Sequence, residues 1–147
     1  MDYDIIIPDN EIRTFPPPAR YGYEKYLVVY PSVARALQST EPFVGVLVQG
    51  NTKEISQQSR KAKEKGLVVL TPAHGYEMDK YIIEKTAVDI IFDFEVLSEK
   101  DHLHYRKSGL NQVLCQLAVQ HEKTIAFSLH SLVASSRPAV ILGRMIQ

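Results

Sequence analysis

The sequence predicts an α/β fold in which short β-strands alternate with helices around a parallel sheet. Two observations support this. Short runs of mostly apolar residues recur along the chain without the polar–apolar alternation of a half-exposed strand. Between them lie stretches with charged faces and helical spacing, joined by links of a few residues. Strands and helices that alternate with short links form βα units, and such units build parallel sheets.

Six runs are predicted to be strands because they are short, rich in β-branched residues and apolar on both faces. In chain order they are Asp4–Pro8, Lys25–Tyr30, Phe43–Val48, Leu67–Thr71, Val88–Phe92 and Thr124–Leu129. The segment between the first two contains Pro16, Pro17 and Pro18. Three prolines exclude regular hydrogen-bonded structure there, so we expect an extended loop.

Five stretches between these runs are predicted to be helices from their spacing and end signals. They are Pro31–Ser39, Thr52–Lys65, Glu77–Thr86, Leu110–His121 and Arg137–Ile146. Gly66 supplies a stop for the second, and Pro138 suits the first turn of the last. The fourth has an apolar face at helical spacing, formed by Leu110, Val113, Leu114, Leu117 and Ala118.

The chain of 147 residues fits one domain, 1–147, with two possible closures of its sheet. One is an open doubly wound sheet, and the other is part of a TIM-barrel-like (βα)8 fold. The apolar, helix-like pattern runs to Arg144–Gln147 without a capping glycine or a polar tail. We therefore expect a TIM-barrel-like fold that is incomplete at its C-terminus and leaves two parallel edges unpaired.

The composition excludes several classes of function. Seventeen basic residues balance seventeen acidic residues, so RNA contact would need a local basic patch. Cys115 is the single cysteine, which excludes an internal disulfide and a cysteine-based zinc site. No apolar run approaches the roughly 18 residues of a membrane span, and the acidic start Met1–Asp4 is unlike a signal peptide. We expect a cytoplasmic protein.

The sequence also lacks the motifs of common catalytic and cofactor sites. No GxGxxG or Walker pattern occurs, and no cofactor is expected. Ser128 follows a strand-like run but has no flanking glycines, which favours an ordinary strand-end residue over a nucleophile.

A metal site is an alternative that the histidines leave open. His102 and His104 have a spacing that can present two imidazoles to one metal. His74 and His130 lie at predicted strand ends, where barrel sites gather. Acidic residues in the fifth strand region could complete a metallohydrolase site, and these are Asp89, Asp93 and Glu95. Since His-x-His is common, the residues alone favour the absence of a metal.

The segment after the fifth strand has the chemistry of a phosphate-binding turn. Arg106 and Lys107 bring two positive charges to the start of a helix, whose exposed N–H groups already favour an anion. Ser108 can cap this helix, and Gly109 permits a tight turn. His104 and the adjacent tyrosine could stack on an unpaired base. The alternative is a solvated loop, which physical chemistry alone favours.

A resemblance to a known family changes this balance. The run Arg106-Lys-Ser-Gly-Leu-Asn-Gln-Val-Leu114, an amphipathic helix and then Ile125–Leu129 resemble the signature of the ribonuclease P protein component 3 family. The similarity extends over about Val88–Met145. The chain departs from the family pattern in having His130 where an arginine is usual, and one residue fewer between the basic pair and Ser108.

The resemblance implies a barrel related to the PHP phosphoesterases but without their metal ligands. It also implies a smaller RRM-like protein partner and a catalytic ribonuclease P RNA that removes the 5′ leader of precursor tRNA. The protein itself would not be catalytic. The RNA-contacting residues would be His104, Arg106 and Lys107, together with Lys100, Arg137 and Arg144.

Two other functions stay open at this point. One is a metal-dependent phosphoesterase of the PHP-like barrel type, which would use His74, Asp93, His102, His104 and His130. The other is a protein-interaction module with no site of its own.

Overall fold

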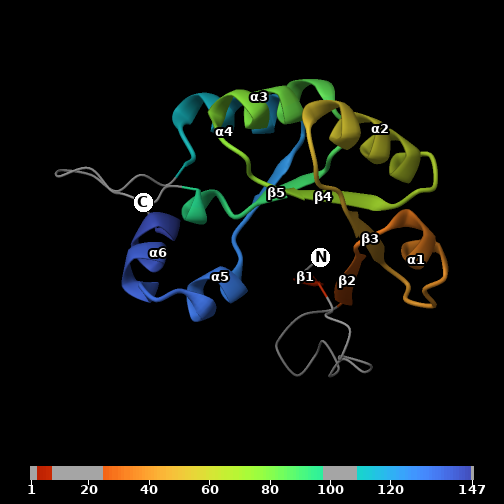
Figure 1. The fold of residues 1–147 in the computed structure, drawn as a ribbon, viewed down its shortest axis with the longest axis horizontal. Helices are drawn as coiled ribbons and strands as arrows, with labels where there is room; N and C mark the ends of the chain where they lie inside the picture. The colour runs from red at the N-terminus through yellow and green to blue at the C-terminus, as the bar shows by residue number, and fades with distance from the viewer. Residues whose placement is uncertain (1–2, 8–24, 98–108, 147) are drawn as a thin grey trace.

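The computed structural model describes residues 3–7, 25–97 and 109–146, which form an α/β fold around one six-stranded parallel sheet (Figure 1). The strands are β1 Tyr3–Ile6, β2 Lys25–Tyr30, β3 Val44–Leu47, β4 Val68–Pro72, β5 Ile90–Phe92 and β6 Thr124–Ala126. The helices are α1 Val33–Leu37, α2 Thr52–Lys63, α3 Tyr76–Lys85, α4 Gln112–Gln120, α5 Leu129–Ala134 and α6 Pro138–Met145, with a short 3-10 helix, η2, at Phe94–Val96. The proline-rich loop predicted around Pro17 lies outside the described residues.

The strand order decides between the two predicted closures. The strands lie in the order β1-β2-β3-β4-β5-β6, and each pairs in parallel with its neighbours in sequence. A doubly wound sheet reverses its order at a switch point, whereas a barrel winds in one direction. The sheet is curled, with α2, α3 and α4 along one face (Figure 1). This half-barrel agrees with an incomplete TIM-like barrel whose edge strands are β1 and β6.

Apolar side chains pack on both faces of the sheet, as the continuous apolar runs predict. Val46, Val69 and Ile91 face the helices and belong to the core that contains Ile55 of α2 and Ile82 of α3. A second cluster lines the inner face of the curl and consists of Leu27, Val29, Leu70 and Ile90. Both clusters are almost fully shielded from solvent.

A glycine makes the tight packing of the inner face possible. A Cβ on Gly45 would lie 3.0 Å from Leu70 Cδ1, 3.1 Å from the Val68 carbonyl oxygen and 3.2 Å from Val29 Cγ2. Such contacts leave no room for a side chain between β2 and β4. The absence of a Cβ on β3 therefore brings the side chains of the two neighbouring strands together.

The ends of α2 follow from its sequence. The Asn51 side chain accepts hydrogen bonds from the N–H groups of Lys53 and Glu54, both at 3.1 Å. The Glu54 side chain in turn accepts a hydrogen bond from the Asn51 N–H at 2.8 Å. This reciprocal capping box satisfies N–H groups that a helix start leaves without partners. After the helix, Gly66 has a φ of 73°, as the predicted stop requires.

The structure corrects the end of the last predicted strand. β6 ends at Ala126, and Ser128 is the N-cap of α5, a helix that the sequence pattern did not predict. The Ser128 Oγ accepts the Ser131 N–H at 3.3 Å, so the apolar run continues into a helix and not along the strand. His130 accordingly lies in the first turn of α5 and not at a strand end.

The start and the buried face of α4 also differ from the prediction. Its N-cap is Asn111, whose Oδ1 accepts the Leu114 N–H at 2.9 Å, while the predicted cap Ser108 lies outside the described residues. Leu114 and Ala118 are buried as predicted. Val113 is 45% exposed, so its place in the predicted core face was wrong.

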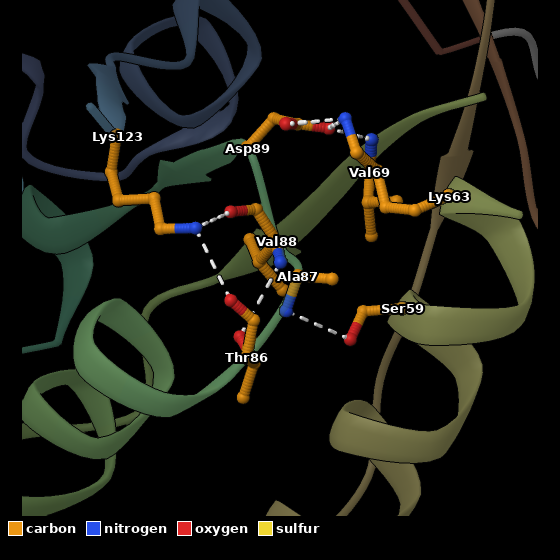
Figure 2. A network of polar contacts seen from close by, with 8 residues as sticks. All are labelled: Ser59, Lys63, Val69, Thr86, Ala87, Val88, Asp89 and Lys123. Carbon is orange, nitrogen blue, oxygen red and sulfur yellow. Dashed lines mark hydrogen bonds and ion pairs between the residues drawn. The ribbon is translucent and has the colours of Figure 1, made fainter. Parts of the chain in front are cut away.

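A network of polar contacts connects the segments at the amino ends of β4, β5 and β6 (Figure 2). Asp89 accepts hydrogen bonds from Lys63 Nζ at 2.9 and 3.2 Å and from the Val69 N–H at 2.8 Å. Lys123 donates to the carbonyl oxygens of Thr86 at 3.2 Å and Val88 at 2.7 Å. The network links α2, the α3–β5 connection and the start of β6, and in barrels this edge supports stability.

Replacing Lys123 by methionine is expected to lower the free energy of unfolding by about 1–3 kcal/mol, because two backbone carbonyls lose their charged donor. Burial lowers the pKa of Lys123, which means that the charged ammonium group is less favourable in the fold than in water. The measurement is urea denaturation followed by circular dichroism. Lys61→Met on the exposed side of α2 is the control, and an equal loss in both variants would contradict the role of the network.

Candidate functional site at the carboxyl ends of β4, β5 and β6

The carboxyl ends of β4, β5 and β6 bring three predicted regions to one edge of the sheet. Pro72 pairs with Phe92, and Phe92 pairs with Ala126. The Ala73 N–H extends this pairing by donating to the Phe92 carbonyl oxygen at 2.7 Å. Barrel enzymes and binding proteins build their sites at this edge, from the loops that follow the strands.

Asp93 ends β5 in a conformation that few residues with side chains adopt. Its φ is 65° and its ψ is 25°, in the left-handed region where aspartate and asparagine are the best-tolerated side chains. Its Oδ1 accepts a hydrogen bond from Ser131 Oγ of α5 at 2.8 Å. Asp93 thus starts the 3-10 turn η2 and also fastens α5 to the end of β5.

Glu95 is completely buried two residues later. Its Oε1 accepts the Ser128 N–H at 3.2 Å, whereas its Oε2 is buried without a hydrogen-bond partner. Burial is the largest influence on its pKa and raises it, and the neighbouring Asp93 charge adds to the increase. Burial therefore makes the charged form of this carboxyl group less favourable than it is in water.

Asp79 is the second buried carboxyl group of this edge. It lies in the first turn of α3 and accepts the backbone N–H groups of His74 at 2.8 Å and Gly75 at 2.9 Å. Burial raises its pKa, and the two N–H groups only partly oppose that increase. The Asp79 side chain thus fixes the β4–α3 turn, in which His74 Nδ1 is buried without a partner.

The turn that leads into α4 lies against η2. Gly109 has a φ of 77°, which confirms the predicted tight turn at this residue. A Cβ at Gly109 would overlap the Phe94 carbonyl oxygen and would lie 3.4 Å from Leu97 Cδ1. Leu97 and Gly109, the described residues on either side of 98–108, therefore lie close together beside η2.

The predicted RNA-contacting residues fall into two groups. Lys100, His104, Arg106 and Lys107 lie outside the described residues. Arg137 is exposed at the N-cap of α6. Arg144 is only 4% exposed, and its Nη1 donates to the Glu95 carbonyl oxygen at 2.9 Å, so this guanidinium group serves internal packing and does not face outward.

The predicted metal ligands do not come together where they can be located. Among residues 3–7, 25–97 and 109–146, no group of three or more histidine, cysteine, aspartate or glutamate side chains is placed to hold a metal ion. Asp89 lies at the opposite edge of the sheet, in the network with Lys63. His102 and His104 are outside the described residues.

The main residues that the sequence reading missed are the two buried carboxyl groups and the serines of α5. Asp79 carries a weak signal, because an acidic residue early in a helix often binds nearby N–H groups. The sequence indicates Glu95 only as a possible metal ligand. No local sequence pattern predicts its burial beneath α5 and α6. Its partners Ser128 and Arg144 are far away in sequence and meet it only in the fold.

Comparison of the chain with protein-family models, with curated proteins and with solved structures gave no match. In the part of the chain that the structure describes, no helix has the length and apolar character of a bilayer-crossing segment.

Proposed function

We propose that the chain is a protein subunit of ribonuclease P that supports the catalytic RNA in 5′ maturation of precursor tRNA. The RNA contacts would come from the basic segment with Lys100, His104, Arg106 and Lys107, with a further contribution from Arg137. A smaller RRM-like protein and the ribonuclease P RNA would be its partners. The chain would act in the cytoplasm and would not cleave RNA alone.

The proposal rests mainly on the motif Arg106–Leu114 and on its position in the sequence between β5 and α4. The motif begins between β5 and α4 and ends within the first turn of α4. Its glycine forms the tight turn that the motif needs, and its asparagine caps α4. These features support an RNA-binding role for the segment after β5, because barrel folds bind their ligands at the carboxyl ends of their strands.

The proposed mechanism is electrostatic. The guanidinium group of Arg106 and the ammonium group of Lys107 would neutralise RNA phosphates near the N-terminus of α4, whose N–H groups add to the positive potential. Neutralised phosphates reduce the repulsion that magnesium ions otherwise screen. The protein would thus lower the magnesium requirement of the catalytic RNA.

The proposed barrel is of the PHP-like kind, with its sheet edge adapted to RNA and not to metal. The buried carboxyl groups support this view, because burial raises the pKa of both and so opposes the deprotonated form that binds a metal ion. Their oxygens instead bind backbone N–H groups of the fold.

Precursor-tRNA cleavage by the reconstituted holoenzyme tests the proposal. The double variant Arg106→Ala/Lys107→Ala is expected to slow cleavage at limiting magnesium. It should also lower the salt dependence of binding to ribonuclease P RNA by about one unit of slope for each lost phosphate contact. Filter binding at several salt concentrations gives the slope.

The matched control is Lys61→Ala/Lys65→Ala, which removes the same charge from exposed positions at the end of α2. This variant should keep the wild-type slope and cleavage rate. If the Arg106/Lys107 variant folds normally by circular dichroism and behaves like this control, the segment is a structural turn and the proposed function is wrong.

A further inference from the structure

The hairpin of α5 and α6 has little apolar attachment to the rest of the fold. Figure 1 shows both helices set apart from the layer of α2, α3 and α4. α5 has no buried residue, and Leu129 and Val133 are 72% and 77% exposed. In α6, Ile141 is the one large apolar side chain that is buried. Elements with so few buried apolar side chains open at a lower free energy than the core.

Among the described residues, three polar contacts join this hairpin to the segment from Asp93 to Glu95. Ser131 Oγ donates to Asp93 Oδ1 at 2.8 Å. The Ser128 N–H donates to Glu95 Oε1 at 3.2 Å, and Arg144 Nη1 donates to the Glu95 carbonyl oxygen at 2.9 Å. One short segment at the carboxyl end of β5 therefore contacts both helices of the hairpin through hydrogen bonds.

The Glu95 carboxyl group lies beneath this attachment in an environment that disfavours charge. It is fully buried, and Oε2 has no hydrogen-bond partner. An ionised carboxylate would place charge on this buried oxygen, to which no protein group donates a hydrogen bond. When the hairpin separates, water reaches the group and that penalty disappears.

The charged groups around Glu95 act in opposite directions. Asp93 at the end of β5 repels an ionised Glu95, whereas the backbone N–H groups of Glu95 and Ser128 favour it; Arg144 on α6 donates to the Glu95 backbone carbonyl oxygen. Burial outweighs the N–H donors that stabilise the carboxylate, and the pKa is raised. His130 and Arg137, the other titratable groups of the hairpin region, are exposed.

We propose that the α5–α6 hairpin is a detachable cover over the carboxyl end of β5, and that the charge on the Glu95 carboxyl group controls its attachment. The neutral acid keeps the hairpin in place, and ionisation releases it. Release would uncover Glu95, and with it the edge of the sheet where ligands of barrel folds bind.

The sign of the pH dependence follows from the raised pKa. Below the pKa of the detached state, Glu95 is neutral in both states and the attachment is complete. As the pH rises from there through the pKa of the attached state, the detached form loses its proton first and the attachment weakens. The expected effect is about tenfold in the opening equilibrium for each unit that separates the two pKa values.

Hydrogen exchange of the full-length chain, corrected for the intrinsic rate, measures this opening between about pH 5 and about pH 8. Amide protection in α5 and α6 is expected to fall as the pH rises in the wild type. In Glu95→Gln, which is neutral at every pH and keeps an acceptor for the Ser128 N–H, protection should stay high and flat. The Val69 amide in β4 is the internal reference and should stay constant.

Two control variants separate Glu95 from other titrating groups. Asp79→Asn alters the other buried carboxyl group, and His130→Gln alters the histidine on α5, so both should keep the wild-type pH dependence. The proposal is overturned if Glu95→Gln retains that dependence or loses protection at all pH values. Parallel loss of protection at Val69 would also overturn it, because opening would then be global.

Discussion

Replacing Phe94 by alanine is expected to lower the free energy of unfolding by about 3–5 kcal/mol, the usual cost of removing a buried aromatic side chain. Phe94 is completely buried and belongs to the core between the sheet and the helices. Its carbonyl oxygen also lies against Gly109, so its backbone supports the turn into α4. The variant would lose the packing of Phe94 in the core and would weaken the support of the turn at Gly109. Urea denaturation measures the resulting loss of stability.

Phe127→Ala is the matched control for this prediction. Phe127 has the same side chain and follows the neighbouring strand β6, but it is 49% exposed. Its replacement should cost far less, because a half-exposed ring leaves no closed cavity. Similar decreases in the free energy of unfolding for the two variants would show that Phe94 of η2 is not part of the buried core.

Replacing Asp79 by alanine is expected to cost between about 1 and 3 kcal/mol for each of the two N–H groups that lose their acceptor. These groups belong to His74 and Gly75 in the β4–α3 turn. Gly75 has a φ of 124°, which residues with side chains rarely adopt, so the turn depends on this support. Thermal unfolding should show a lower midpoint, together with faster amide exchange in the turn.

Asp79→Asn separates the hydrogen bonds from the charge. Asparagine retains one acceptor oxygen, so its loss of stability should be smaller than that of the alanine variant. Burial raises the Asp79 pKa above its ordinary value of 3.8. The wild type should therefore lose stability relative to Asp79→Asn as the pH rises from that value through the folded-state pKa. A difference that does not change with pH would show that Asp79 is not buried in solution.

The sequence predicts the elements of this fold well where composition and end signals agree. Lys25–Tyr30 is a short, largely apolar run rich in valine and tyrosine, and β2 has the same bounds. For α2, the predicted start at Thr52 is correct because Asn51 and Glu54 cap it reciprocally. The sequence favours an incomplete barrel over an open sheet only through its C-terminal pattern, and the strand order, which depends on which strands become neighbours, agrees with that choice.

The candidate site is predicted less completely. Gly109 was correctly predicted to form a turn, since glycine marks such positions in any fold. The burial of Glu95 depends on α5, and that helix was hidden in an apolar run with the composition of a strand. Arg144 is predicted to contact RNA, which requires an exposed side chain, whereas α6 directs its guanidinium group to the Glu95 carbonyl oxygen.

The sequential strand order also has a consequence for how the chain acquires its structure. Every strand of the described sheet pairs only with the strand before it and the strand after it along the chain. Each pairing then closes a loop no longer than the connection between two consecutive strands, which limits the loss of loop-closure entropy at each step. A nascent chain emerging from the ribosome could add each βα unit to the edge of the previous one, because no strand has to wait for a distant partner.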